Sequence, residues 1–222
     1  MDYVSAAKMV LGAMATGDLN TLSTYMNNRE ITQALASRNT AMLHLAVING
    51  FAGAARYLVN HGADLLAMDK DGDIPLTFAA AADDIDGVRI ELIDLLVGAG
   101  SPVDHRNHNG QTPIMPAAKM GYENAAQRLL ELGANARACD NQGRSVMTYA
   151  ANPSRSYCPS ISLVRALVEG GADIDDLYDS DRCLAIDMDP IPRSSRPERY
   201  LYRPGVTVMY VSPSTNLYPE VF

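Results

Sequence analysis

Cysteine is scarce in the 222-residue chain: Cys139, Cys158 and Cys183 form an odd, widely spaced set. A small disulfide-stapled domain carries paired cysteines at high density, so this set argues against a disulfide framework and predicts a reducing compartment. Tryptophan is absent and phenylalanine occurs only three times, yet apolar residues make up 47% of the chain. That fraction is enough for a buried core and argues against disorder throughout.

Basic residues are outnumbered, with 18 Lys and Arg against 26 Asp and Glu and a formal net charge of −8. Nucleic acid and anionic membranes attract basic surfaces. The balance therefore argues against a general affinity for either of them, and it suits a protein partner with a basic surface. No apolar run approaches the roughly 18 residues that a membrane-spanning helix needs.

The N-terminal segment lacks the composition of a secretory signal. Only Lys8 precedes a short apolar patch at residues 9–15. A signal peptide begins with basic residues and continues with a longer apolar run. We therefore expect a cytoplasmic protein. A specialised bacterial apparatus that delivers proteins into a host cell reads other signals, so such delivery is the alternative.

Internal repetition dominates the sequence. A Leu-rich segment followed by a glycine turn occurs four times, and its aligned glycines are Gly62, Gly100, Gly133 and Gly171, with spacings of 38, 33 and 38. A second motif of four residues begins at Ala41, Ile74, Thr112 and Ser145, with spacings of 33, 38 and 33. Two motifs in a common phase over four copies, with a period near 33, predict a solenoid of stacked units.

One copy carries the most complete pattern: Asn109-Gly110-Gln111-Thr112-Pro113-Ile114, then Gly121, then Leu129-Leu130-Glu131-Leu132-Gly133-Ala134-Asn135. The pattern resembles the ankyrin repeat family, and the resemblance covers about four repeats over residues 38–176, with degenerate units at both ends. It implies an all-α solenoid of stacked helix pairs with short β-hairpin fingers. It also implies a protein-binding function.

The residues of one unit agree with this resemblance. Thr112 is expected to cap the first helix of the third unit, with Pro113 at a position where a helix tolerates proline. Gly121 suits the turn between the two helices. The finger is expected at 135–142. Pro116 departs from the family pattern, and we expect it to distort the first helix and reshape the groove there.

Three parts of the chain are expected. Residues 1–37 are interpreted as a degenerate N-terminal capping repeat and residues 38–186 as the ankyrin repeats, the last one incomplete. Residues 187–222 form an irregular Pro/Tyr-rich tail that packs on the solenoid end or extends from it. Two insertions, at 82–87 and 152–160, lengthen the same edge of the stack, where solenoids often make contacts.

No catalytic or cofactor-binding pattern is recognisable. The chain shows no Gly-rich phosphate loop, no nucleophile elbow and no zinc-like cysteine spacing. His44 falls on a helix position where the resemblance implies bonds to neighbouring backbone, and so a structural role. His105 and His108 on one finger, near Asp104, make only a weak metal signal. We expect a non-enzymatic protein with no metal and no cofactor.

Two alternatives to a simple binding module stay open. A catalytic or cation site would have to form in the tail and the last repeat, where Asp187 and Asp189 are the candidates. The tail also carries the Tyr and Arg residues that favour interfaces, so a homo-oligomeric structural protein assembled through it is the second alternative. The chain is thus expected to be a monomer or a tail-mediated dimer.

The binding site is expected on the concave face, which the finger tips and first helices form. The resemblance implies that partner contacts fall beside each finger glycine and before each inter-helix turn. These positions are Ile48, Asn49, Lys70, Asp71, Asp73, His108, Asn109, Gln111, Lys119, Met120, Asn141, Gln142, Arg144, Asp179 and Arg182. The function predicted is sequestration or inhibition of another protein by steric occlusion, as in an antagonist, an immunity-type protein or an effector.

Overall fold

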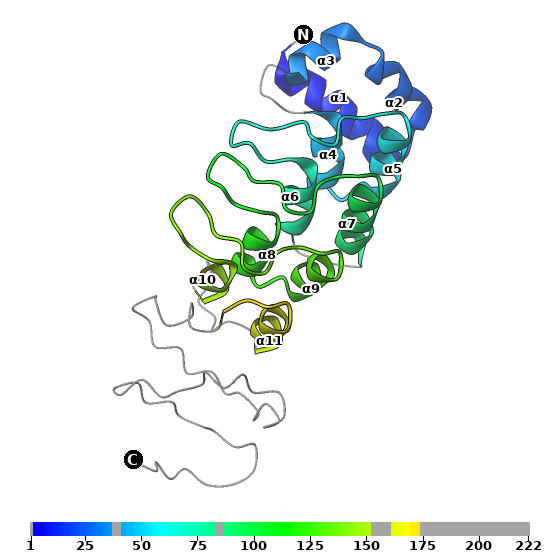
Figure 1. Ribbon diagram of the computed structural model, residues 1–222. Helices are drawn as coiled ribbons and strands as arrows, with labels where there is room; N and C mark the ends of the chain where they lie inside the picture. The colour runs from blue at the N-terminus through cyan, green and yellow to red at the C-terminus, as the bar shows by residue number, and fades with distance from the viewer. Residues whose placement is uncertain (1, 37–40, 83–86, 152–160, 174–222) are drawn as a thin grey trace, which may run out of the picture.

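The structure is a computed structural model that describes residues 2–36, 41–82, 87–151 and 161–173. Its helices follow one another along a single stack (Figure 1). In chain order they are α1 (Tyr3–Thr16), α2 (Leu19–Met26), α3 (Arg29–Ala36), α4 (Met42–Ile48), α5 (Ala52–Asn60), α6 (Pro75–Ala80), α7 (Val88–Gly98), α8 (Ile114–Met120), α9 (Glu123–Glu131), α10 (Val146–Ala151) and α11 (Ile161–Glu169). The all-α stack of helix pairs that the sequence predicts is confirmed.

The helix pairs form two rows. The short helices α4, α6, α8 and α10 make an inner row, and α5, α7, α9 and α11 make an outer row (Figure 1). Beyond the inner row project three loops, which we call finger 1 (63–73), finger 2 (101–111) and finger 3 (134–144). The fingers therefore stand beside one another along one side of the stack.

Small side chains allow the inner helices to approach closely. Ala46, Ala79, Ala117 and Ala150 recur at equivalent places, and each is at most 1% exposed. Helices of six or seven residues are too short to be stable alone. Their stability therefore comes from contact with the next unit.

Leucine forms the spine between the two rows. Leu58, Leu96, Leu129 and Leu167 each lie four residues before the repeated glycine, and each is at most 1% exposed. Burial of one such side chain is worth about 2 kcal/mol. Exposed ion pairs add little to this, although Arg56 on α5 reaches Glu91 on α7 at 2.5 Å.

Three helices precede the first pair. The carboxylate of Asp2 accepts a hydrogen bond from the Ser5 amide at 2.9 Å and so caps α1, which ends at Gly17 in a left-handed conformation. α1 packs against α2, α3 and α4, and Val10 and Leu22 are fully buried. The interpretation of residues 1–37 as a capping repeat stays a prediction, and the tail at 187–222 lies outside the described residues.

One expectation about α8 is wrong, and the distortion expected at Pro116 stays a prediction. The residue that precedes the helix is Pro113, and the hydroxyl of Thr112 caps nothing: its Oγ1 is buried and has no hydrogen-bond partner among the described residues. Pro116 does not break the helix, which runs on to Met120. The reason is position, because Pro116 lies in the first turn, where a backbone N–H has no partner within the helix anyway.

The fingers are turns rather than β-hairpins. Within the described segments no strand forms, and the one isolated bridge joins Cys139 to Ser145. The tip of finger 1 is closed by backbone bonds from the Asp69 amide to the Asp73 carbonyl at 3.0 Å and from the Gly72 amide to the Asp69 carbonyl at 3.2 Å. Backbone bonds of this kind and side-chain acceptors together close the short loops, and the pairing does not continue into strands.

Candidate protein-binding surface

Each finger is folded around one acceptor side chain. The Oδ1 atom of Asp69 in finger 1, of Asn107 in finger 2 and of Asp140 in finger 3 accepts hydrogen bonds from the amides two and four residues further on, at 2.8–3.0 Å. This is an Asx turn. It fixes the tip that carries most of the predicted contact residues.

Backbone hydrogen bonds tie each finger to the next. The His108 amide of finger 2 donates to the Asp71 carbonyl of finger 1 at 3.0 Å, and the Asn141 amide of finger 3 donates to the Asn109 carbonyl of finger 2 at 2.9 Å. The side chain of Asn141 adds a bond to the His108 carbonyl at 3.0 Å. We call this set of bonds the finger ladder; it holds the three tips in one row.

His44 joins the inner row to finger 1. Its Nδ1 accepts a hydrogen bond from the Ala41 amide, and its Nε2 donates to the Asp73 carbonyl, both at 3.2 Å. The Phe78 ring packs edge-on against the imidazole at 5.5 Å. Burial lowers the pKa of His44, so the ring is neutral and both nitrogens serve the fold. The contacts to neighbouring backbone that the sequence predicts for His44 are present.

Two of the predicted contact residues, Asp73 and Gln111, are half-buried and hydrogen-bonded inside the molecule. Asp73 accepts a hydrogen bond from Asn107 Nδ2 at 2.9 Å, and burial raises the pKa of its carboxyl. Gln111 accepts from Asn107 at 3.2 Å and donates to the Tyr149 hydroxyl at 2.6 Å. The polar groups of these two side chains are therefore already hydrogen-bonded within the fold and are less available to a partner.

A buried carboxylate organises finger 3. The Asp140 side chain is 0% exposed, and its Oδ2 accepts from the Tyr149 hydroxyl at 2.8 Å and from Arg144 Nε at 2.7 Å. Burial raises the pKa of Asp140, but these bonds and those from the Arg144 and Gln142 amides outweigh burial and lower it. The Arg144 side chain is 45% exposed, so it still reaches solvent.

Most other predicted contact residues are exposed. They lie at the finger tips and at the C-terminal ends of α4 and α8: Ile48, Asn49, Lys70, Asp71, His108, Asn109, Lys119, Asn141, Gln142 and Arg144. Met120 is half-buried, and Asp179 and Arg182 lie outside the described residues. We call this exposed set the finger face.

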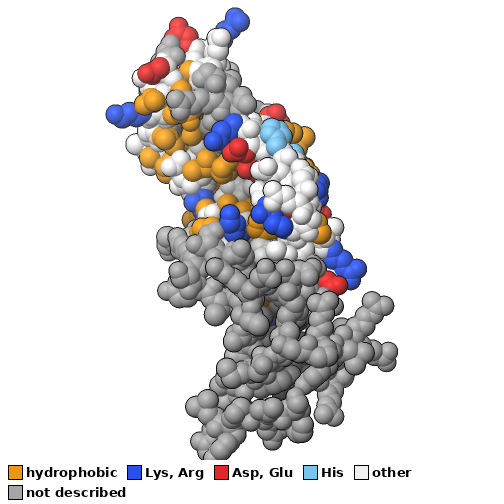
Figure 2. Space-filling model, turned by 90° about the vertical axis from the view of Figure 1, so that its left-hand side faces the viewer, with side chains coloured by type: hydrophobic (Ala, Val, Ile, Leu, Met, Phe, Trp, Pro, Cys, Tyr) orange, Lys and Arg blue, Asp and Glu red, His pale blue; other side chains and the backbone are white. Residues whose placement is uncertain are grey.

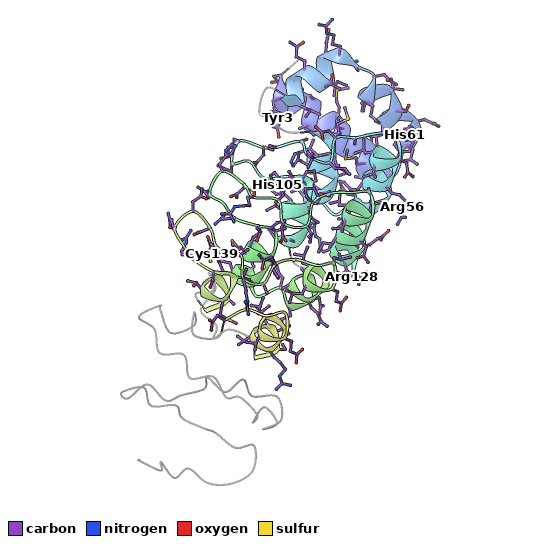
Figure 3. The ribbon with its side chains drawn as sticks, viewed as in Figure 1. Tyr3, Arg56, His61, His105, Arg128 and Cys139 are labelled. Carbon is purple, nitrogen blue, oxygen red and sulfur yellow. The ribbon has the colours of Figure 1, made fainter. Side chains whose placement is uncertain are left out.

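The finger face is chemically mixed. Figure 2, which looks onto the finger side, shows apolar side chains gathered toward the N-terminal end and single charged side chains of both signs dispersed among neutral ones. Figure 3 places His105 and Cys139 on the fingers and Arg56 and Arg128 on the outer row. In the described part of the chain, no cluster of three His, Cys, Asp or Glu residues could hold a metal ion. The arrangement suits protein recognition.

Sequence reasoning missed four residues that build this face. Asp69, Asn107 and Asp140 make the turns, and Tyr149 joins finger 2 to finger 3. A signal for the first three was available, because an Asp or Asn stands three residues before each finger glycine. Tyr149 had no comparable signal.

The stacked helix pairs with a row of fingers define a solenoid repeat protein. Residues 39–70 match the family described as "Ankyrin repeat", and residues 87–177 match "Ankyrin repeats (3 copies)". The chain belongs to the ankyrin repeat family, as the sequence motifs predict. No helix of the described residues is both long and apolar enough to cross a membrane.

Curated proteins similar to this chain include human "Neurogenic locus notch homolog protein 2", 38% identical over 120 residues, which are 54% of this chain and 5% of that protein. Another is "Probable 26S proteasome regulatory subunit p28" of Saccharomyces cerevisiae, 32% identical over 120 residues, which are 53% of this chain and 50% of that protein. The similarity thus spans half or less of each of these two relatives.

Proposed function

We propose that the chain is a non-enzymatic binding protein that sequesters or inhibits a partner protein by steric occlusion through the finger face. The observation that carries this proposal is the finger ladder. Because bonds between His108 and Asp71 and between Asn141 and Asn109 hold the tips in place, the face is formed before a partner arrives. A pre-formed surface loses little conformational entropy on binding, and so retains more of its contact energy.

The net charge of −8 supports a partner with a basic surface. The yeast relative, whose name is that of a probable regulatory subunit of the proteasome, supports a role as a bound regulator. We place the encounter in the cytoplasm, including that of a host cell, and assign the chain to the antagonist, immunity-type or effector proteins.

The test is a triple substitution on the finger face. His108→Ala, Lys119→Glu and Gln142→Ala change exposed side chains and leave the backbone bonds of the ladder in place. With the partner captured from the source cell and purified, we expect the triple variant to bind at least about 100-fold more weakly by calorimetry, because a few anchors carry most interface energy.

The matched control changes three exposed residues of the outer row: Asn60→Ala, Asn124→Ala and Gln127→Ala. This variant should bind like the wild type. If the partner binds the finger-face triple as tightly as the wild type, the finger face is not the binding surface and the proposal fails.

A further inference from the structure

The three fingers present equivalent residues to solvent. Counted from the repeated glycine, five positions are exposed in every finger. They are Asp64, Leu66, Met68, Lys70 and Asp71 in finger 1, Pro102, Asp104, Arg106, His108 and Asn109 in finger 2, and Asn135, Arg137, Cys139, Asn141 and Gln142 in finger 3. A residue of one finger can therefore be compared directly with its counterparts.

Finger 1 differs from the others at two of these positions. Leu66 is 50% exposed and Met68 is 47% exposed, which makes them two of the few large apolar side chains that the described residues leave in water. The counterparts of Leu66 bond to the next unit: Asp104 accepts from the Asn135 amide at 3.0 Å, and Arg137 donates to the Gly171 carbonyl at 2.6 Å. The Leu66 side chain cannot form such a hydrogen bond, so finger 1 lacks this polar link to the next unit.

Charge also separates finger 1 from the others. It carries four aspartates and one lysine, whereas finger 2 carries one aspartate and one arginine, and finger 3 carries one aspartate and two arginines. The only lysine, Lys70, is paired with Asp71 at 3.8 Å. Asp64 and Asp71 are both exposed. Two exposed apolar side chains thus lie on the one finger with a marked negative charge.

We propose that finger 1 is the anchor for a basic segment of a partner protein that carries a large apolar side chain next to Lys or Arg. The proposal rests on the function proposed above and names the chemistry of the partner. Leu66 and Met68 supply the apolar contact, and the carboxylates of Asp64 and Asp71 attract the flanking cations. An anionic membrane or nucleic acid would be repelled by the same carboxylates.

Selection from a library of short random peptides tests this chemistry directly. The bait is the intact chain, and the selected peptides are then measured against three variants. One is Leu66→Ser with Met68→Ser, and a second is Asp64→Asn with Asp71→Asn. The control is Val4→Ser with Met9→Ser, which changes two exposed apolar side chains of α1. All of these residues are exposed, so the urea midpoint should stay that of the wild type.

We expect selected peptides to be net positive with a large apolar residue beside Lys or Arg. Their affinity should fall at least about tenfold in each finger 1 variant and stay unchanged in the α1 control. A library whose binders are neutral or acidic, or that yields no binder dependent on finger 1, overturns the proposal. Peptides lost by the finger-face triple variant but kept by both finger 1 variants would leave the proposed function standing and remove this inference alone.

Discussion

Replacing Asp140 with alanine is expected to lower the free energy of unfolding by about 3 kcal/mol. The carboxylate has no exposed surface, and it accepts hydrogen bonds from Tyr149, from the guanidinium of Arg144 and from two backbone amides of finger 3. Without it the Tyr149 hydroxyl loses its acceptor and the two amides lose the bonds that fold the tip. Urea denaturation of the intact chain measures the loss.

Two variants serve as controls. Asp140→Asn keeps an Oδ1 acceptor for the two amides but removes the charge that Arg144 faces, so its loss should lie between wild type and Asp140→Ala. Asp71→Ala changes an exposed side chain, and its effect should stay within about 0.5 kcal/mol. Equal stability of Asp140→Ala and Asp71→Ala would show that the carboxylate does not organise finger 3.

Gly72→Ala is expected to lower the free energy of unfolding by about 3 kcal/mol. Gly72 has φ of 82°, a left-handed conformation that costs an alanine about 1 kcal/mol or more. In addition, the new Cβ would lie 2.8 Å from the backbone nitrogen of His108, an atom held by the finger ladder. The backbone of finger 2 must therefore shift, and the ladder bond to Asp71 must lengthen or break.

Gly143 provides the matched control for this substitution. Its φ is 77°, close to that of Gly72, but no described atom comes within 4 Å of the place that a Cβ would take. Gly143→Ala should therefore carry only the conformational cost, about 1 kcal/mol. Equal losses for the two variants in urea denaturation would contradict the close approach of fingers 1 and 2.

The fold could be predicted from the sequence because its repeats are stabilised by local, periodic contacts. The phase of the two motifs gives the number of units, and the leucines before each glycine form the buried spine. Thr112 was misjudged because a residue type alone does not fix its place in a helix. Pro113 takes the cap position, and Pro116 falls in the first turn, where a backbone N–H has no partner within the helix.

The candidate site could be predicted only in part. The tip positions followed from the family pattern, but that pattern does not tell which of these side chains form hydrogen bonds inside the molecule. Asp73 of finger 1 and Gln111 of finger 2 both accept hydrogen bonds from the Asn107 side chain. Tyr149 lies 38 residues from Gln111, so their bond depends on stacking that no local motif encodes.

Amide hydrogen exchange of the free protein tests most directly whether the binding surface is formed in advance. In the structure the amides of His108 and Asn141 donate to carbonyls of neighbouring fingers. They should exchange at least about 100-fold more slowly than in an unfolded chain, without any partner present. Exchange of both amides at unfolded-chain rates would mean that the fingers are not joined, and the pre-formed finger face would be refuted.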